Sequence, residues 1–261
     1  MIANLETLAP RKTQRYGWRP QRPDHRDFQY TKKAPKVVPA AIDRFTYPLI
    51  SAYDQSNLGS CTGNGCGRIF QYRGIKEFGR FPTPSRLFIY WWERFLEGTV
   101  KTDSGAEVRD GLKVLAQYGA PPETDWPYDI RKFATKPPTK ASADAKKHIG
   151  LQYQAVVGRG LSGQIDAVRT AIANLDPVVF GFAVRSSFES VDVANAGIYS
   201  PTSRESVIGG HCVVFDGYDD KTETFWCANS WGADWGLQGW FRMRYETLKD
   251  CADFWVLDSV K

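Results

Sequence analysis

Apolar side chains recur every three or four residues in three segments of the first half of the chain, which is the spacing of an amphipathic helix. The first such segment is 62–78, and Gly79 follows it as a stop. The second has Thr83 as its predicted N-cap and ends at Gly98, and the third begins at a capping box formed by Ser104 and Glu107 and ends at Gly119. The first half is therefore predicted to be helical.

The pattern changes after residue 119. The segment 120–150 contains five prolines and is predicted to be an extended crossover. A helix is expected near 162–175, and short β-rich runs follow at 177–184, 211–218, 222–231, 239–245 and 253–260. A helical half followed by a mostly antiparallel β half predicts an α+β fold of two lobes, a helical lobe over about 50–150 and a β-barrel-like lobe over about 151–261, with a cleft between them.

Composition indicates a globular protein, with 261 residues of which 42% are hydrophobic and 24% charged. The net charge of +5 is concentrated in residues 1–36, called the leader below, which hold nine Lys or Arg and three Asp or Glu. The body is close to neutral, so we expect neither a nucleic-acid nor a membrane partner, and we expect a monomer. The chain has no apolar signal sequence or membrane-spanning stretch, which predicts a cytoplasmic protein or export by a non-classical route.

The glycine-rich stretch 57–72 allows three interpretations. It lacks the lysine and the glycine spacing of a phosphate-binding loop. A zinc site would have to combine Cys61, Cys66, His211 and Cys212, whose spacing is not that of zinc ligands. The third interpretation is a reactive thiol, because Cys61 stands at the start of a predicted helix, where the helix dipole favours a thiolate.

A catalytic thiol needs a base, and the base needs an orienting group. His25 lies in the leader and His148 in the proline-rich segment, whereas His211 directly precedes a predicted strand. Asn229 follows 18 residues later and can accept a hydrogen bond from an imidazole N–H. Gln55 stands six residues before Cys61, where its amide could donate to an oxyanion together with the Cys61 backbone N–H.

These residues lie in motifs that resemble the papain-like cysteine peptidases. The motifs are QSNLGSC at 55–61, GHCVVFDGY around His211 and NSWGADWGLQGW at 229–240, and the resemblance extends over about 37–261. It implies the papain-like fold, with Cys61 as nucleophile, His211 as base and later acid, Asn229 as its orienting residue, and Gln55 in the oxyanion hole. It also implies that Trp231 and Trp235 cover the His–Asn hydrogen bond, and it implies no metal or organic cofactor.

The chain departs from the usual family pattern near the nucleophile. Leu58 replaces a cysteine, which fits the expectation that all five cysteines are reduced, and Thr62 and Gly63 replace the usual Trp-Ala pair. The pattern is similar to bacterial or phage-borne members of the family.

By position, the pocket for the second residue before the scissile bond is expected to be lined by Gly105, Ala106, Val108, Gly181 and Gly210, with Trp231 also in the substrate site. These small, apolar walls suggest an apolar substrate side chain.

The resemblance predicts a cysteine endopeptidase acting on peptides or proteins through a thioester acyl-enzyme. Two alternatives remain open: a thiol acyltransferase of the transglutaminase-like kind, and a catalytically silent peptide-binding protein.

The leader is too short and too rich in proline to form the long helical pro-segment of lysosomal relatives. We expect it to act as a pro-segment-like extension of a zymogen that lies across or beside the cleft and limits access to Cys61.

Overall fold

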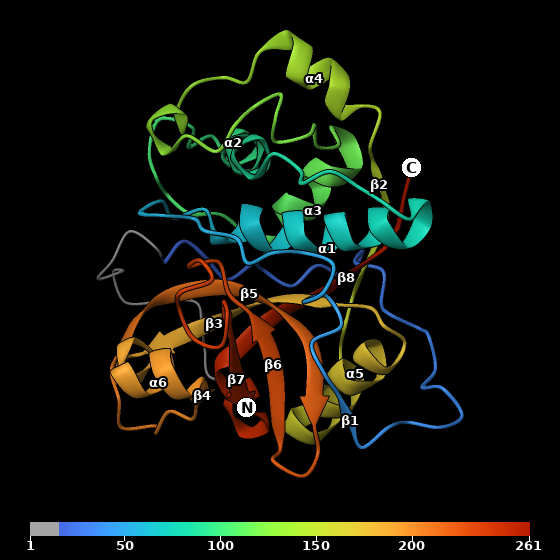
Figure 1. The fold of residues 1–261 in the computed structure, drawn as a ribbon, viewed down its shortest axis with the longest axis vertical. Coiled ribbons are helices and arrows are strands. Elements are labelled where there is room, and N and C mark those ends of the chain that lie inside the picture. Colours follow the sequence, from blue (N-terminus) through green and yellow to red (C-terminus); the bar gives the residue numbers. More distant parts are fainter. Residues whose placement is uncertain (1–15) are drawn as a thin grey trace.

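The structure is a computed structural model that describes residues 16–261, and it confirms the α+β papain-like class. Figure 1 shows the helices α1–α4 gathered on one side of the molecule and the sheet with α5 and α6 on the other. The helices are α1 (Cys61–Phe78), α2 (Arg86–Leu96), α3 (Val108–Gln117), α4 (Thr139–Ala145), α5 (Gly160–Ala173) and α6 (Val191–Ala196). Short 3-10 helices cover Ile130–Lys132, Ser186–Glu189 and Tyr245–Asp250.

Helix boundaries follow the sequence pattern for α1 and depart from it for α2 and α3. Helix α1 ends at Gly79, which adopts the left-handed conformation at φ 75°. The cap of α2 is Ser85 rather than Thr83, since its hydroxyl accepts the Phe88 N–H at 3.2 Å. The predicted capping box of α3 is wrong, because that helix begins at Val108 and the Ser104 hydroxyl lies 2.8 Å from that of Thr99.

The β lobe is built on one sheet. The strands are β1 (Ala41–Ile42), β2 (Gly150–Ala155), β3 (Val178–Arg185), β4 (Ile198–Tyr199), β5 (Val207–Asp219), β6 (Thr224–Ala228), β7 (Trp240–Arg244) and β8 (Cys251–Val260). Within the described residues the order is β2-β8-β3-β5-β6-β7-β4, with β1 paired to β5. The pairs are antiparallel except β4 with β7. The expected extended crossover over 120–150 is interrupted by α4, and the expected strands are all present.

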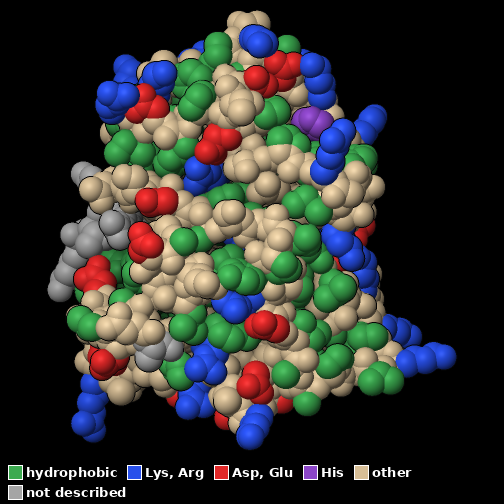
Figure 2. Space-filling view, viewed as in Figure 1, with side chains coloured by type: hydrophobic (Ala, Val, Ile, Leu, Met, Phe, Trp, Pro, Cys, Tyr) green, Lys and Arg blue, Asp and Glu red, His purple; other side chains and the backbone are tan. Residues whose placement is uncertain are grey.

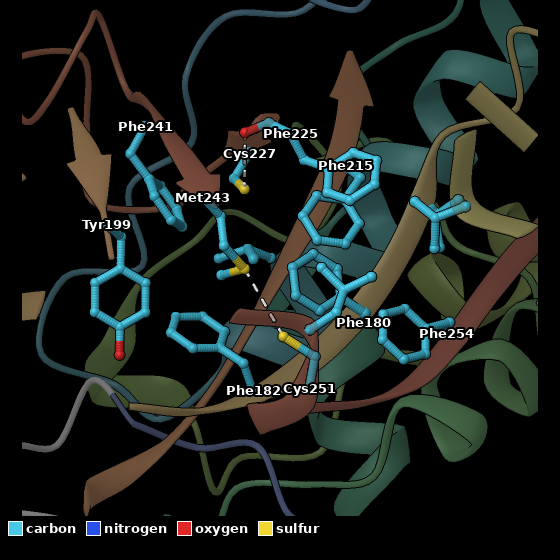
Figure 3. Close-up of a cluster of buried hydrophobic side chains, with 14 of the residues drawn as sticks. Phe180, Phe182, Tyr199, Phe215, Phe225, Cys227, Phe241, Met243, Cys251 and Phe254 are labelled. Atoms are coloured by element: carbon cyan, nitrogen blue, oxygen red, sulfur yellow. Dashed lines mark hydrogen bonds between the residues drawn. The ribbon is translucent and has the colours of Figure 1, made fainter. Parts of the chain in front are cut away.

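Aromatic side chains fill the core of the β lobe. Figure 3 shows the rings of Phe180, Phe215 and Phe254 close together, and the Phe180 and Phe215 centroids lie 3.7 Å apart. Cys251 lies in the same core with its sulfur 3.8 Å from that of Met243. Because these contacts bury large apolar areas on the face of β3 that carries Phe180 and Phe182, they stabilise that strand.

The two lobes meet where α1 packs on the sheet. A Cβ built at Gly65 of α1 would lie 2.9 Å from both Cys212 Sγ of β5 and Val179 Cγ2 of β3. Only a glycine therefore allows this approach, and it brings the start of α1 beside the middle of β5. Gly65 thus serves helix–sheet packing, whereas Gly63 and Gly67 face α2.

The surface is of mixed charge. Figure 2 shows Lys and Arg side chains interspersed with Asp and Glu side chains over the face in view. Within residues 16–261, no helix combines the length and the apolar character needed to cross a lipid bilayer.

Candidate active site

Cys61 is the first residue of α1, and its side chain is completely buried. Burial raises the pKa of the Cys61 thiol to about 12, although the backbone groups of Gly17, Cys212 and Thr62 act in the opposite direction. The Cys212 backbone lies close enough to lower the pKa of Cys61, so the thiol lies beside the residue that follows His211 on β5. Burial of Cys61 therefore favours the protonated thiol.

His211 and Asn229 are brought together by β5 and by the turn after β6. His211 Nε2 lies 2.8 Å from Asn229 Oδ1. The backbone N–H of Ser230 donates to the same oxygen at 2.8 Å, which identifies that atom as the acceptor. Nε2 therefore carries a proton toward Asn229, and Nδ1 is the ring nitrogen through which His211 can exchange a proton with another group.

Two tryptophans pack over this hydrogen bond. The Trp231 ring lies 5.2 Å from the His211 ring at an interplanar angle of 34°, and Trp235 packs on Trp231 at 5.1 Å. His211 is completely buried and Asn229 is nearly so. A hydrogen bond in such surroundings orients the imidazole more strongly than one exposed to water.

Gln55 lies buried in the segment before α1. Its Nε2 donates to Leu58 O at 2.7 Å, and its Oε1 accepts the Ser230 hydroxyl at 2.6 Å. Its backbone N–H donates to Ser230 O at 2.8 Å. These bonds hold the Gln55 segment to the turn that carries Asn229, so the structure couples the two halves of the candidate site through Ser230.

The residues expected to bind substrate lie around the leader. The Trp18 N–H donates to Gly210 O at 2.9 Å, and the Arg19 N–H donates to Ala106 O at 3.0 Å. In return the Ala106 N–H donates to Gly17 O at 2.8 Å, which makes the pairing parallel. Gly181 packs against the Trp18 ring, while Gly105 packs on Gly17 and Val108 belongs to the apolar cluster that contains Trp18.

Residues 1–15 of the leader lie outside the described residues, and its described part, residues 16–36, also packs on the candidate catalytic residues. Figure 1 shows it crossing between α1 and β5. The Tyr16 ring packs edge-on against His211 with centroids 5.9 Å apart, and it lies 6.0 Å from the Trp231 ring. Gly17 packs so closely on Gly59 that a side chain there would overlap the Gly59 carbonyl. Tyr16 and Gly17 therefore pack directly over His211 and beside the buried thiol.

Several residues of this region escaped the sequence analysis. Asp253 of β8 accepts the Trp18 indole N–H at 3.0 Å, and Ser230 joins Gln55 to the Asn229 turn. Ser230 lies inside a quoted motif and could have been singled out there. Asp253 carries no local signal, because it meets Trp18 only through the folded sheet.

The other thiols and histidines take no part in the His211–Asn229 hydrogen bond. All five cysteines are free and buried, and burial raises the pKa of the Cys66, Cys212, Cys227 and Cys251 thiols well above the ordinary value. His25 is exposed, while His148 is half-buried against Phe81 with ring centroids 4.9 Å apart. Among the described residues, no group of three or more His, Cys, Asp or Glu is placed to hold a metal ion.

Comparison with known proteins agrees with this fold. Residues 101–253 match the papain family of cysteine proteases. The chain belongs to that family and is a papain-like cysteine peptidase, which implies peptide or protein substrates.

Two relatives resemble the chain over nearly its whole length. It is similar to xylellain, a cysteine protease from Xylella fastidiosa, with 36% identity over 98% of this chain and 100% of that one at a TM-score of 0.86. It is 37% identical to an uncharacterized peptidase C1-like protein of Acanthamoeba polyphaga mimivirus over 94% of this chain and 87% of that protein. A procathepsin B of Trypanosoma congolense shares the fold at a TM-score of 0.73 and 16% identity over 93% of this chain and 85% of that one.

Proposed function

We propose that the protein is a cysteine endopeptidase whose catalytic residues are Cys61, His211 and Asn229. The observation that carries this proposal is the 2.8 Å contact between His211 Nε2 and Asn229 Oδ1, on the strand that passes beside the thiol. Asn229 fixes the imidazole so that Nδ1 takes the thiol proton. The start of α1 then stabilises the thiolate through its unpaired N–H groups and its dipole.

The reaction follows from these positions. The Cys61 sulfur attacks the carbonyl carbon of the scissile peptide bond, and the carbonyl electrons move to oxygen. The Gln55 side-chain amide and the Cys61 backbone N–H donate to that oxyanion. His211 gives its proton to the leaving amine, and the thioester forms as the C–N bond breaks. Water, deprotonated by His211, then hydrolyses the thioester and restores the thiol.

The leader is proposed to limit access to this site. Supporting contacts are the packing of Tyr16 on His211 and the backbone pairing of residues 17–19 with Ala106 and Gly210. A substrate carbonyl cannot reach Cys61 while these residues fill the cleft. Displacing the leader also returns water to the thiol, which lowers the pKa of Cys61 from the value that burial imposes.

Active-site labelling with the epoxide inhibitor E-64, followed by peptide mass mapping, tests the catalytic assignment. We expect one label per chain, confined to Cys61, in a Gly17→Ala variant whose leader is displaced. His211→Ala in that background abolishes labelling, whereas His148→Ala, which removes a histidine outside the site, leaves it unchanged. Labelling at another cysteine, or labelling of Cys61 that is insensitive to His211→Ala, contradicts the proposal.

Product analysis separates hydrolysis from the two alternatives. With an added primary amine in large excess, an endopeptidase still releases mainly free carboxylate products, whereas an acyltransferase releases amides. A silent binding protein would retain peptides without any turnover that depends on Cys61. A Cys61→Ser variant provides the background for each measurement.

A further inference from the structure

The Trp18 side chain occupies a pocket between β3 and β8, and only 1% of it is exposed. Gly181 of β3 forms one side of this pocket, where a Cβ would overlap the indole ring. Phe180 and Phe182 point to the opposite face of β3, into the aromatic core, so the room for the ring comes from the missing side chain of Gly181. The pocket therefore accepts a planar group lying flat on the Gly181 backbone.

Asp253 supplies the polar end of this pocket. Its Oδ2 accepts the Trp18 indole N–H at 3.0 Å and the Gln21 backbone N–H at 3.0 Å. Both donors come from the leader. When the leader leaves the cleft, this oxygen loses both bonds, and a group that enters the pocket must replace at least one of them.

The backbone around Asp253 is arranged to aim this carboxyl. Val179 pairs with Trp255 and Gly181 with Ala252, so a two-residue step on β3 faces a three-residue step on β8. The extra residue forms a β-bulge, and Asp253 adopts a left-handed conformation at φ 58°. Bulges near active sites redirect side chains. A non-glycine residue in the left-handed conformation costs free energy, which other contacts in the fold must offset.

Charges of both signs surround the carboxyl. Glu107 raises and Arg109 lowers its pKa, while burial, the largest cause, brings the pKa of Asp253 to about 7. His25, Asp24 and Asp27 of the leader line an adjoining cavity of about 350 Å³. An incoming N–H group or cation would satisfy the Asp253 oxygen, whereas an aliphatic side chain would leave it without a donor.

We propose that this pocket recognises a substrate side chain and selects planar N–H donors, namely tryptophan and arginine, over aliphatic side chains. The inference rests on the proposed function, because the pocket adjoins the cleft at Cys61. Tryptophan reproduces the contact that Trp18 makes. Arginine lays a planar guanidinium on Gly181 and donates to the Asp253 carboxylate, a geometry that lysine cannot match.

The first test uses the leader itself as the occupant, in the full chain and without any need for turnover. The rate at which a small thiol reagent modifies Cys61 is measured for W18F, W18L and W18R, with Cys61→Ser as background. We expect W18R to be modified as slowly as wild type, and W18F and W18L about five-fold faster or more, because each loses one net hydrogen bond. Equal rates for W18R and W18L would overturn the proposal.

Asp253→Asn separates the two kinds of occupant, and asparagine tolerates the same left-handed backbone. In D253N, wild-type Trp18 should still protect Cys61, because an amide oxygen accepts an indole N–H. W18R should lose its protection by about ten-fold, because no carboxylate remains to pair with the guanidinium. The control is Asp192→Asn, which changes an exposed carboxylate of α6 and should alter none of these rates. Retained protection of W18R in D253N contradicts the charge pairing.

The second test reads substrates directly. With W18L as the open enzyme, peptides that differ at one position are compared by kcat/KM. We expect tryptophan and arginine to exceed leucine by about ten-fold at one position before the scissile bond, and D253N to lose the arginine preference alone. A preference for leucine overturns the proposal. If no variant cleaves any peptide, the catalytic assignment fails, while the thiol-modification rates still decide the chemistry of the pocket.

Discussion

Tyr16 packs its ring edge-on against the His211 imidazole, and the next residue, Gly17, lies against the Cys61 thiol. Two consecutive leader residues thus contact the candidate base and the candidate nucleophile. Gly17 can do so because it has no side chain, since Gly59 O occupies the space that a Cβ would need.

Gly17→Ala is expected to displace the leader from the thiol. The added methyl group overlaps the Gly59 carbonyl, so the closed arrangement cannot form without movement of the backbone. Modification of Cys61 by a small thiol reagent should accelerate by about ten-fold or more. The control is Lys33→Ala, at an exposed leader position, which should leave the rate unchanged. Equal rates for the two variants would contradict a role of Gly17 in closure.

Asn229→Ala is expected to lower kcat by about ten-fold or more with little change in KM. The substitution removes the oxygen that accepts from His211 Nε2, so the imidazole loses its orientation while the substrate pocket is untouched. Steady-state kinetics in the open W18L background provide the measurement, and Asn195→Ala, at an exposed position of α6, is the control. A change confined to KM would argue that Asn229 acts on binding alone.

Asp176 links the leader to both lobes. Its carboxylate pairs with Arg73 of α1 and accepts the Tyr30 hydroxyl at 2.8 Å, and Lys32 Nζ lies at 3.1 Å. Asp176→Ala should lower the free energy of unfolding by about 3–5 kcal/mol, because Arg73 is then buried without its counter-charge. Lys32→Met should cost less than about 1 kcal/mol, since the Lys32 side chain is 43% exposed. Urea denaturation of both variants provides the measurement. Equal losses of unfolding free energy would refute the role of Asp176 as the counter-charge of Arg73.

Stability should fall as the pH rises from about 5 to 8. Burial raises the pKa of Glu97 to about 7, even though Arg19 acts against it. Since the folded state binds this proton more tightly than the unfolded state, its stabilising contribution is complete at low pH and is lost as the pH rises through about 7. The loss for Glu97 is about 2–3 kcal/mol.

The urea midpoint measured against pH provides the check on this dependence. Glu97→Gln should flatten the curve, because the amide does not titrate. Glu246→Gln changes an exposed glutamate and should leave the curve as in wild type. A midpoint that rises between pH 5 and 8 would show that other groups dominate.

A matched pair of glycine substitutions in α1 tests the contact between the lobes. Gly65→Ala places a methyl group 2.9 Å from Cys212 Sγ and Val179 Cγ2, and overpacking of this kind costs about 1–3 kcal/mol. Gly67→Ala meets its nearest neighbour, Arg86 Cγ, at 3.3 Å, and it gains up to about 1 kcal/mol of helix propensity. We therefore expect Gly65→Ala to lower the denaturation midpoint and Gly67→Ala to hold or raise it. The reverse order would refute the packing argument.

Much of this structure could be predicted from local sequence. The start and stop of α1 are encoded by a few adjacent residues, and Asn229 could be paired with His211 because each lies in a short, distinctive motif. The cap of α2 could not be assigned in the same way, because Thr83 and Ser85 are both good capping residues and the choice depends on tertiary contacts: the Ser85 N–H donates to Pro121 O and its hydroxyl to Trp126 O.

The pocket around Trp18 lies beyond the reach of local patterns. Trp18 and Asp253 are separated by 235 positions in the sequence, and they meet only because a β-bulge turns the aspartate toward β3. Alternation along β8 does not reveal such a bulge, since one extra residue reverses the side to which every later side chain points. The small residues expected to line this pocket therefore predict an apolar site, and the Asp253 carboxyl cannot be predicted from the sequence.

The leader, which is proposed to limit access to Cys61, belongs to the same polypeptide as the site on which its residues 16–19 pack. A segment tethered so close to its binding site acts as a ligand at an effective concentration in the millimolar range. Its occupancy is therefore independent of how dilute the protein is, and dilution alone does not open the cleft. Under the proposed function, a free peptide must therefore bind far more tightly than the leader in order to displace it from Cys61.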